Sequence, residues 1–189
     1  MKKDSKGIKY KQHTISVWNE VAPFYHKRWA KKEIGPFAVT KKLLDLSKIK
    51  NGDSVLDLAC GTGLVTKKLI RKVGKDGQIY AIDSSESAIK IAKKWAGTPK
   101  NLHFVRADAE KVQFNTKFDA ITCQYALFFF PNEQKVLKNM KKMLKKNGLV
   151  LPKIYIMLEQ MLKKFNLIQN LMQLHVSMHY SFSLMNKKS

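Results

Sequence analysis

The chain has 189 residues, of which 44% are hydrophobic, and its 36 lysines and arginines outnumber 14 acidic residues, giving a formal net charge of +22. This length and apolar content suit one α/β domain with its own hydrophobic core. No apolar run follows the basic N-terminus, and polar residues interrupt residues 165–186, so we expect neither a signal peptide nor a transmembrane span. The two cysteines, Cys60 and Cys123, give no disulfide framework, so we expect a cytoplasmic protein. We interpret both as buried fillers rather than ligands or nucleophiles and expect no metal site.

The positive charge is nearly all lysine, since Arg28, Arg71 and Arg106 are the three arginines. Arginine is the residue that makes bidentate contacts to phosphates and base edges. The lysines are spread over every predicted helix, apart from those at positions 2, 3, 6, 9 and 11 in an expected basic tail. Spread lysine is typical of solvated helix faces, so nucleic acid stays an alternative partner that is not favoured.

The N-terminal region, residues 1–32, reads as that basic tail followed by an amphipathic helix. Its apolar face is formed by Ile15, Trp18, Val21, Ala22 and Tyr25. Pro23 is expected to bend this helix. A second helix is predicted over residues 37–46, and a turn at residues 51–53 precedes the first strand.

Residues 55–66 read VLDLACGTGLVT, which predicts a buried strand, a glycine turn and the start of a helix. Such a turn lets backbone N–H groups and the helix dipole face a ligand closely. A dinucleotide fingerprint would place Gly or Ala where Thr66 stands, and it requires no acid at Asp57. That acid suits the ammonium group of S-adenosylmethionine, although a turn that binds no ligand remains the alternative.

Three further strand ends are predicted at the same edge of the sheet. Residues 78–83 end in Asp83, which can accept both hydroxyls of an adenosine ribose or can simply cap the helix that follows over residues 85–95. Residues 101–109 end in Asp108-Ala109, near where an adenine amine would lie. Residues 118–127 carry Gln124 and Tyr125 opposite the glycine loop. We therefore predict an α/β fold with a Rossmann-like parallel sheet and helices on both faces, and we expect the strand order 3-2-1-4-5 that is usual for such a sheet.

With these motifs, residues 15–150 resemble the class I S-adenosylmethionine-dependent methyltransferases, and most closely their ubiquinone/menaquinone biosynthesis branch. The resemblance implies S-adenosylmethionine as cofactor, with the glycine loop on its methionine part, Asp83 on the ribose, Asp108-Ala109 around the adenine and Gln124 contacting it from the fourth strand. It also implies an N-terminal lid that includes Tyr25. The expected cofactor-binding residues are Asp57, Ala59, Gly61, Thr62, Gly63, Asp83, Ser84, Asp108, Ala109 and Gln124.

The end of the chain departs from this family. We divide the chain into residues 1–32, a Rossmann-like core over 33–152, and an amphipathic helix and tail over 153–189. The last helix of the core is predicted over 132–146, with Asn147-Gly148 as its C-cap. Too few residues follow for the usual last two strands, and an apolar helix stripe over 154–174 is expected instead. That stripe either covers the open sheet, binds a partner or second copy, or is a truncated or altered tail.

The predicted reaction is methyl transfer to a small-molecule acceptor, aromatic or lipid-like in view of Phe128, Phe129 and Phe130. The sequence identifies no catalytic base, and Tyr25, His26 and Tyr125 are positional candidates for the substrate side. Two alternatives remain. The chain could bind the cofactor without turnover, as an inactive or partner-dependent module, or it could methylate RNA.

Overall fold

The computed structural model describes residues 5–150, which belong to one compact unit of the chain. The helices are α1 (Ser5–Tyr25), α2 (Thr40–Leu46), α3 (Leu64–Val73), α4 (Glu86–Ala96) and α5 (Glu133–Met143). The strands are β1 (Ser54–Leu58), β2 (Gln78–Asp83), β3 (Leu102–Arg106), β4 (Phe118–Thr122) and β5 (Leu144–Val150). Short helical turns cover His26–Ala30, Gly35–Phe37 and Leu127–Phe129.

All five strands form one parallel sheet in the order β3-β2-β1-β4-β5, which confirms the predicted topology. The central strand β1 pairs with β2 from Ser54 opposite Gln78 to Leu58 opposite Ile82. On its other side, Val55 of β1 lies opposite Ala120 of β4. The chain reverses its winding at β1, so β1 and β4 enclose the switch point where parallel sheets collect ligands.

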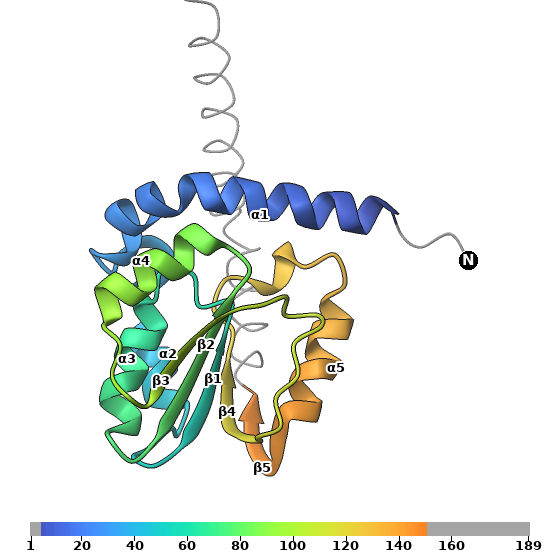
Figure 1. Cartoon of the computed structure of the whole chain (residues 1–189). Coiled ribbons are helices and arrows are strands. Elements are labelled where there is room, and N and C mark those ends of the chain that lie inside the picture. The colour runs from blue at the N-terminus through green and yellow to red at the C-terminus, as the bar shows by residue number, and fades with distance from the viewer. Residues whose placement is uncertain (1–4, 151–189) are drawn as a thin grey trace, which may run out of the picture. The chain divides into compact units, whose positions relative to one another are not determined.

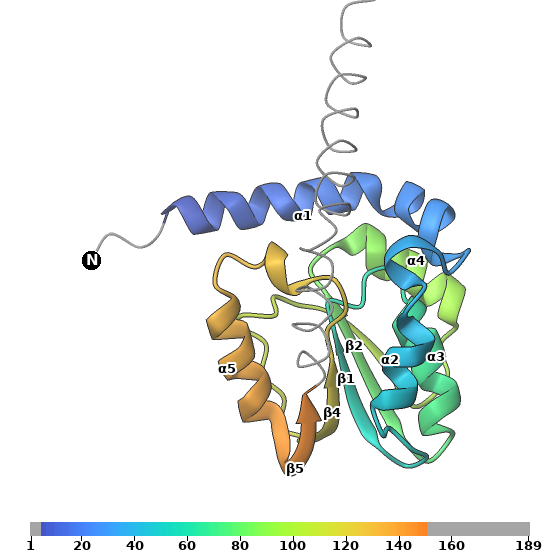
Figure 2. The same cartoon turned by 180° about the vertical axis from the view of Figure 1, so that it is seen from behind.

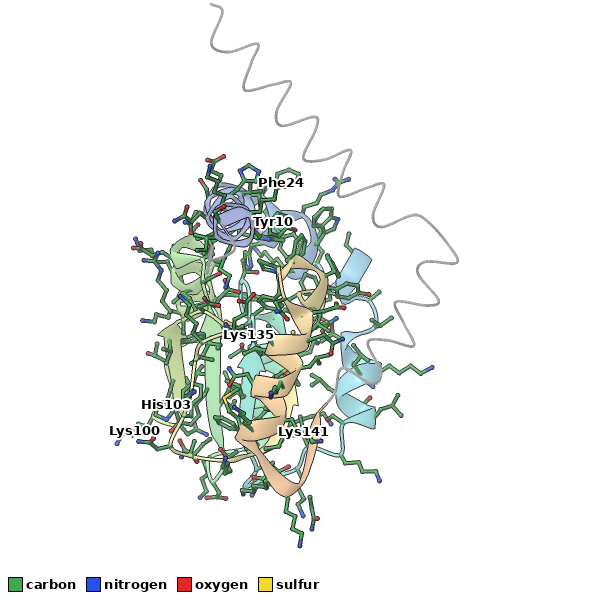
Figure 3. The ribbon with its side chains drawn as sticks, turned by 90° about the vertical axis from the view of Figure 1, so that its right-hand side faces the viewer. Tyr10, Phe24, Lys100, His103, Lys135 and Lys141 are labelled. Carbon is green, nitrogen blue, oxygen red and sulfur yellow. The ribbon has the colours of Figure 1, made fainter. Side chains whose placement is uncertain are left out.

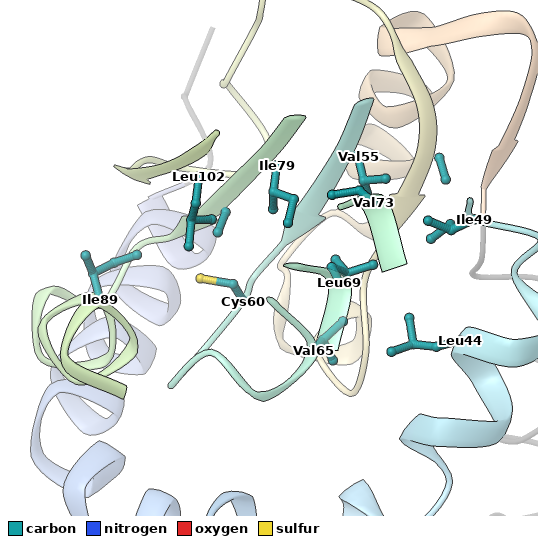
Figure 4. Close-up of a cluster of buried hydrophobic side chains, with 12 residues drawn as sticks. Leu44, Ile49, Val55, Cys60, Val65, Leu69, Val73, Ile79, Ile89 and Leu102 are labelled. Carbon is teal, nitrogen blue, oxygen red and sulfur yellow. The ribbon is translucent and has the colours of Figure 1, made fainter. Parts of the chain in front are cut away.

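The main hydrophobic cluster lies between the sheet and the helices α2, α3 and α4 (Figures 2 and 4). Strand residues Val55, Ile79 and Leu102 meet Leu69 of α3 and Ile89 of α4 there. The near-continuous apolar strands are typical of a parallel sheet that is covered on both faces. This packing fixes the ends of β1 and β2 relative to the helices that follow them.

The segment 107–117 lies on the opposite side of the sheet from α2, and α5 flanks the β4–β5 end (Figures 1 and 3). The Phe114 ring of this segment lies 5.2 Å from the Tyr80 ring and 5.4 Å from the Phe118 ring. Both contacts are edge-on, the arrangement that aromatic rings prefer. The segment is therefore packed onto the sheet, which holds the loop after β3 in place.

The predicted end of the last core helix is wrong. Helix α5 ends at Met143, and Asn147-Gly148 lies inside β5 rather than in a helix cap. The register of β5 shifts, because Phe118 pairs with Leu144 but Ala120 pairs with Leu149. A Cβ at Gly148 would come within 2.9 Å of the Phe118 carbonyl oxygen. The glycine therefore permits close approach of two strands at an irregular register. In the sequence, a glycine with this role looks the same as a glycine that ends a helix.

Helix α1 begins at Ser5, so part of the expected basic tail is helical and Lys11 belongs to the helix. The helix continues through Pro23 and passes into a π-helical turn, His26–Ala30. The second helix is shorter than predicted, because the chain forms a 3₁₀ turn at Gly35–Phe37 before α2. Helix α1 lies across the edge of the sheet at which the strands end (Figures 1 and 2).

The helix predicted over residues 154–174, its partner contact and the missing last strands lie outside the described residues. Among residues 5–150, no helix is both long and apolar enough to cross a membrane.

Candidate ligand site at the carboxyl edge of the sheet

A pocket lies where the strands end, beneath α1. The residues that line it come from α1, the end of β1 and the glycine loop after it, the starts of α3 and α4, the ends of β2, β3 and β4, and the segments around residues 37 and 126–131. They are Lys11, Thr14, Ile15, Trp18, Ala22, Tyr25, Phe37, Asp57, Ala59, Cys60, Gly61, Thr62, Leu64, Val65, Asp83, Ser84, Ser85, Ala88, Asp108, Ala109, Gln124, Tyr125, Ala126, Phe129, Phe130 and Pro131.

The glycine loop connects β1 to α3 through a series of left-handed residues. Gly61 has φ +54° and Gly63 has φ +89°. A Cβ at Gly61 would meet no atom within 4 Å, so this backbone faces open space. A Cβ at Gly63 would lie 2.9 Å from the Ala92 side chain, so this glycine lets the start of α3 pack against α4. Gly61 thus gives the pocket an open stretch of backbone, and Gly63 permits the close packing of α3 against α4.

Asp57 is buried at the floor of the pocket, with 1% of its surface exposed. Its two carboxylate oxygens accept hydrogen bonds from the hydroxyls of Thr66 (2.6 Å) and Thr122 (2.7 Å). Burial raises the pKa of Asp57 to about 6, although the threonine hydrogen bonds act in the opposite direction. The site therefore holds a desolvated carboxylate that a positive group would stabilise.

Asp83 joins the end of β2 to the glycine loop. Its carboxylate accepts hydrogen bonds from the backbone N–H of Gly61 (2.9 Å) and of Ser85 (2.8 Å). Burial raises the pKa of Asp83 as well, against the lowering effect of these bonds. A carboxylate can accept about four hydrogen bonds, so acceptor positions remain for a ligand hydroxyl. The helix cap itself is Ser85, whose hydroxyl accepts from the Ala88 N–H (3.1 Å).

Asp108 follows β3 and is engaged by the N-terminal helix. Lys11 Nζ lies 3.1 and 2.9 Å from the two carboxylate oxygens of Asp108 and 2.9 Å from a carboxylate oxygen of Glu110. Burial raises the pKa of Asp108, but the hydrogen bonds from Lys11 and from the Glu110 N–H, together with the positive charges of Lys11 and Lys111, outweigh burial and the pKa is lowered. Asp108 is therefore ionised beside the pocket.

Gln124 and Tyr125 close the side of the pocket at the end of β4. The Gln124 side chain is hydrogen-bonded to the hydroxyl of Thr40, with 3.0 Å between Gln124 Nε2 and Thr40 Oγ1. Thr40 is fully buried at the start of α2. Tyr125 has a left-handed φ of +54°, which is uncommon for a residue with a Cβ. Ala59, directly after β1, shares this feature with φ +56°. Such strained residues cluster at functional sites.

The remaining wall is aromatic. The Trp18 ring lies 5.1 Å from the Tyr25 ring and 5.4 Å from the Phe129 ring, and the Tyr25 ring lies 5.5 Å from that of Phe37, all edge-on. Burial raises the pKa of the Tyr25 phenol far above its usual value. This half of the pocket therefore offers flat apolar surface, whereas the carboxylates lie around the strand ends.

Most of the predicted site residues come together at this pocket. Nine of the ten expected cofactor residues line it, with Tyr25 and Tyr125 of the substrate candidates; Gly63 does not, for the packing reason given above. His26 is not among the lining residues. Its ring packs edge-on against Trp95 at 4.6 Å, and its Nδ1 is buried without a hydrogen-bond partner among residues 5–150. The π-helical turn that begins at His26 places this side chain against α4.

Sequence reasoning missed Lys11 and Thr40. The run of lysines predicts a basic tail that includes Lys11, although the spacing of Lys11 from Ile15 and Trp18, at i+4 and i+7, places all three on one helix face. Thr40 carries no such signal, since its link to Gln124 joins residues that are 84 positions apart. Cys60 and Cys123 are buried and free, and burial raises the pKa of both thiols, so they fit the predicted role of neutral fillers.

A family described as "Methyltransferase domain" matches residues 49–183. The chain is 37% identical over 112 residues to the ubiquinone/menaquinone biosynthesis C-methyltransferase UbiE of Pseudomonas fluorescens (strain Pf0-1), covering 57% of this chain and 44% of that protein. UbiE of Escherichia fergusonii is 33% identical over 140 residues, covering 71% and 52%. The chain thus spans about half the length of these curated relatives. A solved SAM dependent methyltransferase from Aquifex aeolicus is 25% identical with a TM-score of 0.54, covering 61% of this chain and 65% of that one.

Proposed function

Because the chain belongs to the family of methyltransferase domains, we propose that it binds S-adenosylmethionine in the pocket under α1 and transfers the methyl group to a small molecule. The observation that carries the proposal is the convergence of Asp57, Asp83, Asp108 and Gln124, from the ends of four neighbouring strands, on one pocket. No two of these residues are adjacent in the sequence. The parallel sheet alone brings them to one edge.

The methionine half of the cofactor matches the glycine loop and Asp57. Its ammonium group would supply the positive charge that the buried Asp57 carboxylate lacks. Gly61 offers open backbone for close approach. The Thr62 hydroxyl is buried and has no hydrogen-bond partner among the described residues, so it is available to a ligand. Polar groups that are buried without a partner are uncommon and indicate an absent bonding group.

The adenosine half matches the other strand ends. Asp83 retains acceptor positions for the ribose hydroxyls, and Asp108 can accept from the exocyclic amine of adenine. When bound, the cofactor would supply a sulfonium methyl: its C–S bond would break with both electrons kept by the sulfur of the departing S-adenosylhomocysteine, the nucleophilic atom of the acceptor would bond to the carbon, and the acceptor would lose its proton to water. The contribution of the protein is alignment and exclusion of water.

We propose a small aromatic acceptor, of the phenol or quinol type. The aromatic wall of Trp18, Tyr25, Phe37 and Phe129 supports this choice, because flat apolar rings pack well against a planar ligand. The curated relatives are named for ubiquinone and menaquinone biosynthesis, which points to the same chemical class. Tyr125 is the candidate that contacts the acceptor, and we assign no catalytic base.

Calorimetry with S-adenosylhomocysteine, S-adenosylmethionine and NADH tests the cofactor. We expect the two sulfur compounds to bind and Asp83→Ala to weaken them at least tenfold, which corresponds to about 1.5–3 kcal/mol for hydrogen bonds to a charged group. Asp76→Ala is the matched control, since Asp76 lies on the exposed turn before β2 and bonds to Asn51. Binding of NADH in preference to S-adenosylhomocysteine would refute the proposal.

A second experiment separates an enzyme from a module that only binds the cofactor. The fact that the chain spans about half of its curated relatives makes this alternative worth testing. Methyl transfer to a panel of phenols and quinols is followed by mass spectrometry of the products. Tight binding of S-adenosylhomocysteine with no methylated product from any acceptor would favour the binding module.

A further inference from the structure

Helix α1 is fixed above the pocket by polar anchors on two sides. On one side, Asn19 Oδ1 accepts hydrogen bonds from the Ser85 hydroxyl (2.8 Å) and from the Ser87 N–H (3.3 Å) at the start of α4. On the other side, Lys11 forms ion pairs with Asp108 and Glu110 after β3. The helix therefore bridges the ends of β2 and β3, as its course in Figure 1 shows.

The residues of α1 between these two anchors cover the pocket. Thr14, Ile15 and Trp18 all line it from above. A ligand that lies along the strand ends is therefore covered on one side by α1, and release of one end of the helix would uncover it. The two ends are held by different kinds of interaction.

The C-terminal half of α1 is held mainly by packing. Ala22 is fully buried, and Tyr25 is 8% exposed within the aromatic wall. The N-terminal half has no comparable packing, since Ile8 and Tyr10 are about half exposed. Its described ion pairs are those of Lys11, whose side chain keeps 23% of its surface exposed. The Lys11 end is therefore the one that opens at lower free-energy cost.

The charges at this end are mutually dependent. Burial lowers the pKa of Lys11, but the hydrogen bonds to Glu110 and Asp108 and the negative charges of these two groups together outweigh burial, so the pKa is raised and the ammonium group stays charged. The other oxygen of Glu110, Oε1, is buried without a partner among the described residues. Loss of Lys11 would leave two neighbouring carboxylates without their shared cation.

We propose that Lys11 is a positioning residue that latches α1 over the bound cofactor through Asp108 and Glu110, and that the helix opens at this end to release the product. This proposal rests on the proposed function, because it assumes that S-adenosylmethionine and S-adenosylhomocysteine occupy the pocket. It assigns to Lys11 a second effect, since the same ion pair orients the Asp108 carboxylate that we assign to the adenine.

The rate of S-adenosylhomocysteine dissociation tests the latch, followed by stopped-flow tryptophan fluorescence because Trp18 lines the pocket. We expect Lys11→Met to speed dissociation about tenfold, as for loss of a partly buried charged hydrogen bond. Lys11→Arg, which retains the charge and can bridge both carboxylates, should stay within about threefold of the wild type. Lys9→Met is the matched control, since Lys9 is exposed on the same helix.

Hydrogen exchange of α1 provides a readout that does not depend on turnover. In Lys11→Met, amides on the N-terminal side of Thr14 should exchange faster than in the wild type, with and without S-adenosylhomocysteine, while the Tyr25 end is unchanged. In the wild type, added salt should speed dissociation, because it screens the ion pair. The salt dependence of dissociation uses the wild type alone, so it tests the latch even if Lys11→Met folds poorly.

The outcomes separate the two proposals. If the wild type does not bind S-adenosylhomocysteine, the proposed function fails. If it binds, and Lys11→Met matches Lys9→Met in dissociation rate and in exchange of α1, the latch is refuted. If Lys11→Met folds poorly, the latch is refuted when dissociation of S-adenosylhomocysteine from the wild type does not depend on salt.

Discussion

Asp57 combines full burial with a carboxylate that titrates near neutral pH. Burial raises its pKa from 3.8 to about 6, so the folded protein binds this proton more tightly than the unfolded chain does. The group therefore stabilises the fold below about pH 4, and this contribution is lost as the pH rises through 6. A cationic ligand acts in the opposite sense, because it favours the ionised carboxylate.

This opposition predicts how cofactor affinity depends on pH. Below about pH 6 a proton has to leave Asp57 before an ammonium group can pair with it, so affinity should fall by up to about tenfold per pH unit as the solution becomes more acidic. Calorimetry with S-adenosylhomocysteine between about pH 5 and 8 measures this. Asp57→Asn should bind more weakly at pH 7 and should flatten the dependence. An equally steep profile in Asp57→Asn would assign the titration to another group, of which Asp83 is the nearest candidate.

Thr40 shows how a buried residue outside the pocket can set the position of one inside it. Thr40→Val keeps the volume and removes the hydroxyl that bonds to Gln124, so we expect the dissociation constant of S-adenosylhomocysteine to rise about three- to tenfold, as for one neutral hydrogen bond. Thr40→Ser retains the hydroxyl and should restore the affinity. If the serine variant is as weak as the valine variant, Thr40 acts through packing of α2 rather than through Gln124.

At the scale of elements, the glycine loop separates ligand contact from helix packing. Gly61→Ala places a methyl group in open space and costs only the left-handed φ, about 1–2 kcal/mol of stability. Gly63→Ala adds an overlap with Ala92, so we expect a further loss of about 1–3 kcal/mol. Urea unfolding compares the two variants.

Cofactor binding should distinguish the same two variants in a second way. The methyl group of Gly61→Ala projects where we place the methionine half, so this variant should bind S-adenosylhomocysteine poorly while remaining well folded. If Gly61→Ala binds like the wild type, the cofactor does not approach this backbone. If both variants unfold at the same urea concentration, the overlap with Ala92 does not change the free energy of unfolding.

The elements also show which features the sequence predicts. The strands and the positions of Asp57, Gly61 and Asp83 follow from local apolar runs, glycines and acids at strand ends, and the strand order follows from the Rossmann-like class that these elements indicate. The Lys11–Asp108 contact joins residues 97 positions apart and depends on how α1 lies over the sheet, which no local pattern encodes. The helix end predicted at Asn147-Gly148 is wrong because close approach of two strands and a helix cap both favour glycine, and the local sequence does not distinguish them.

At the scale of the whole molecule, the charge of +22 predicts an affinity for polyanions that is separate from the pocket. Lys135 and Lys141 lie on α5 and Lys100 lies in the turn before β3, and all three are exposed (Figure 3). Arg106, one of the three arginines, is paired with Glu86. The described surface therefore offers scattered charge rather than an arranged set of bidentate groups.

We therefore expect weak binding to single-stranded RNA and DNA alike, falling steeply between about 50 and 200 mM salt, as counterion release requires. Fluorescence anisotropy with oligonucleotides of mixed sequence measures this, and S-adenosylhomocysteine affinity measured in the same salt series serves as the comparison. Radiolabelled methyl groups should not enter the RNA. Salt-resistant binding of RNA in preference to DNA, together with methyl incorporation into it, would instead make RNA the acceptor and place the lysines of α1 and α5 along its path.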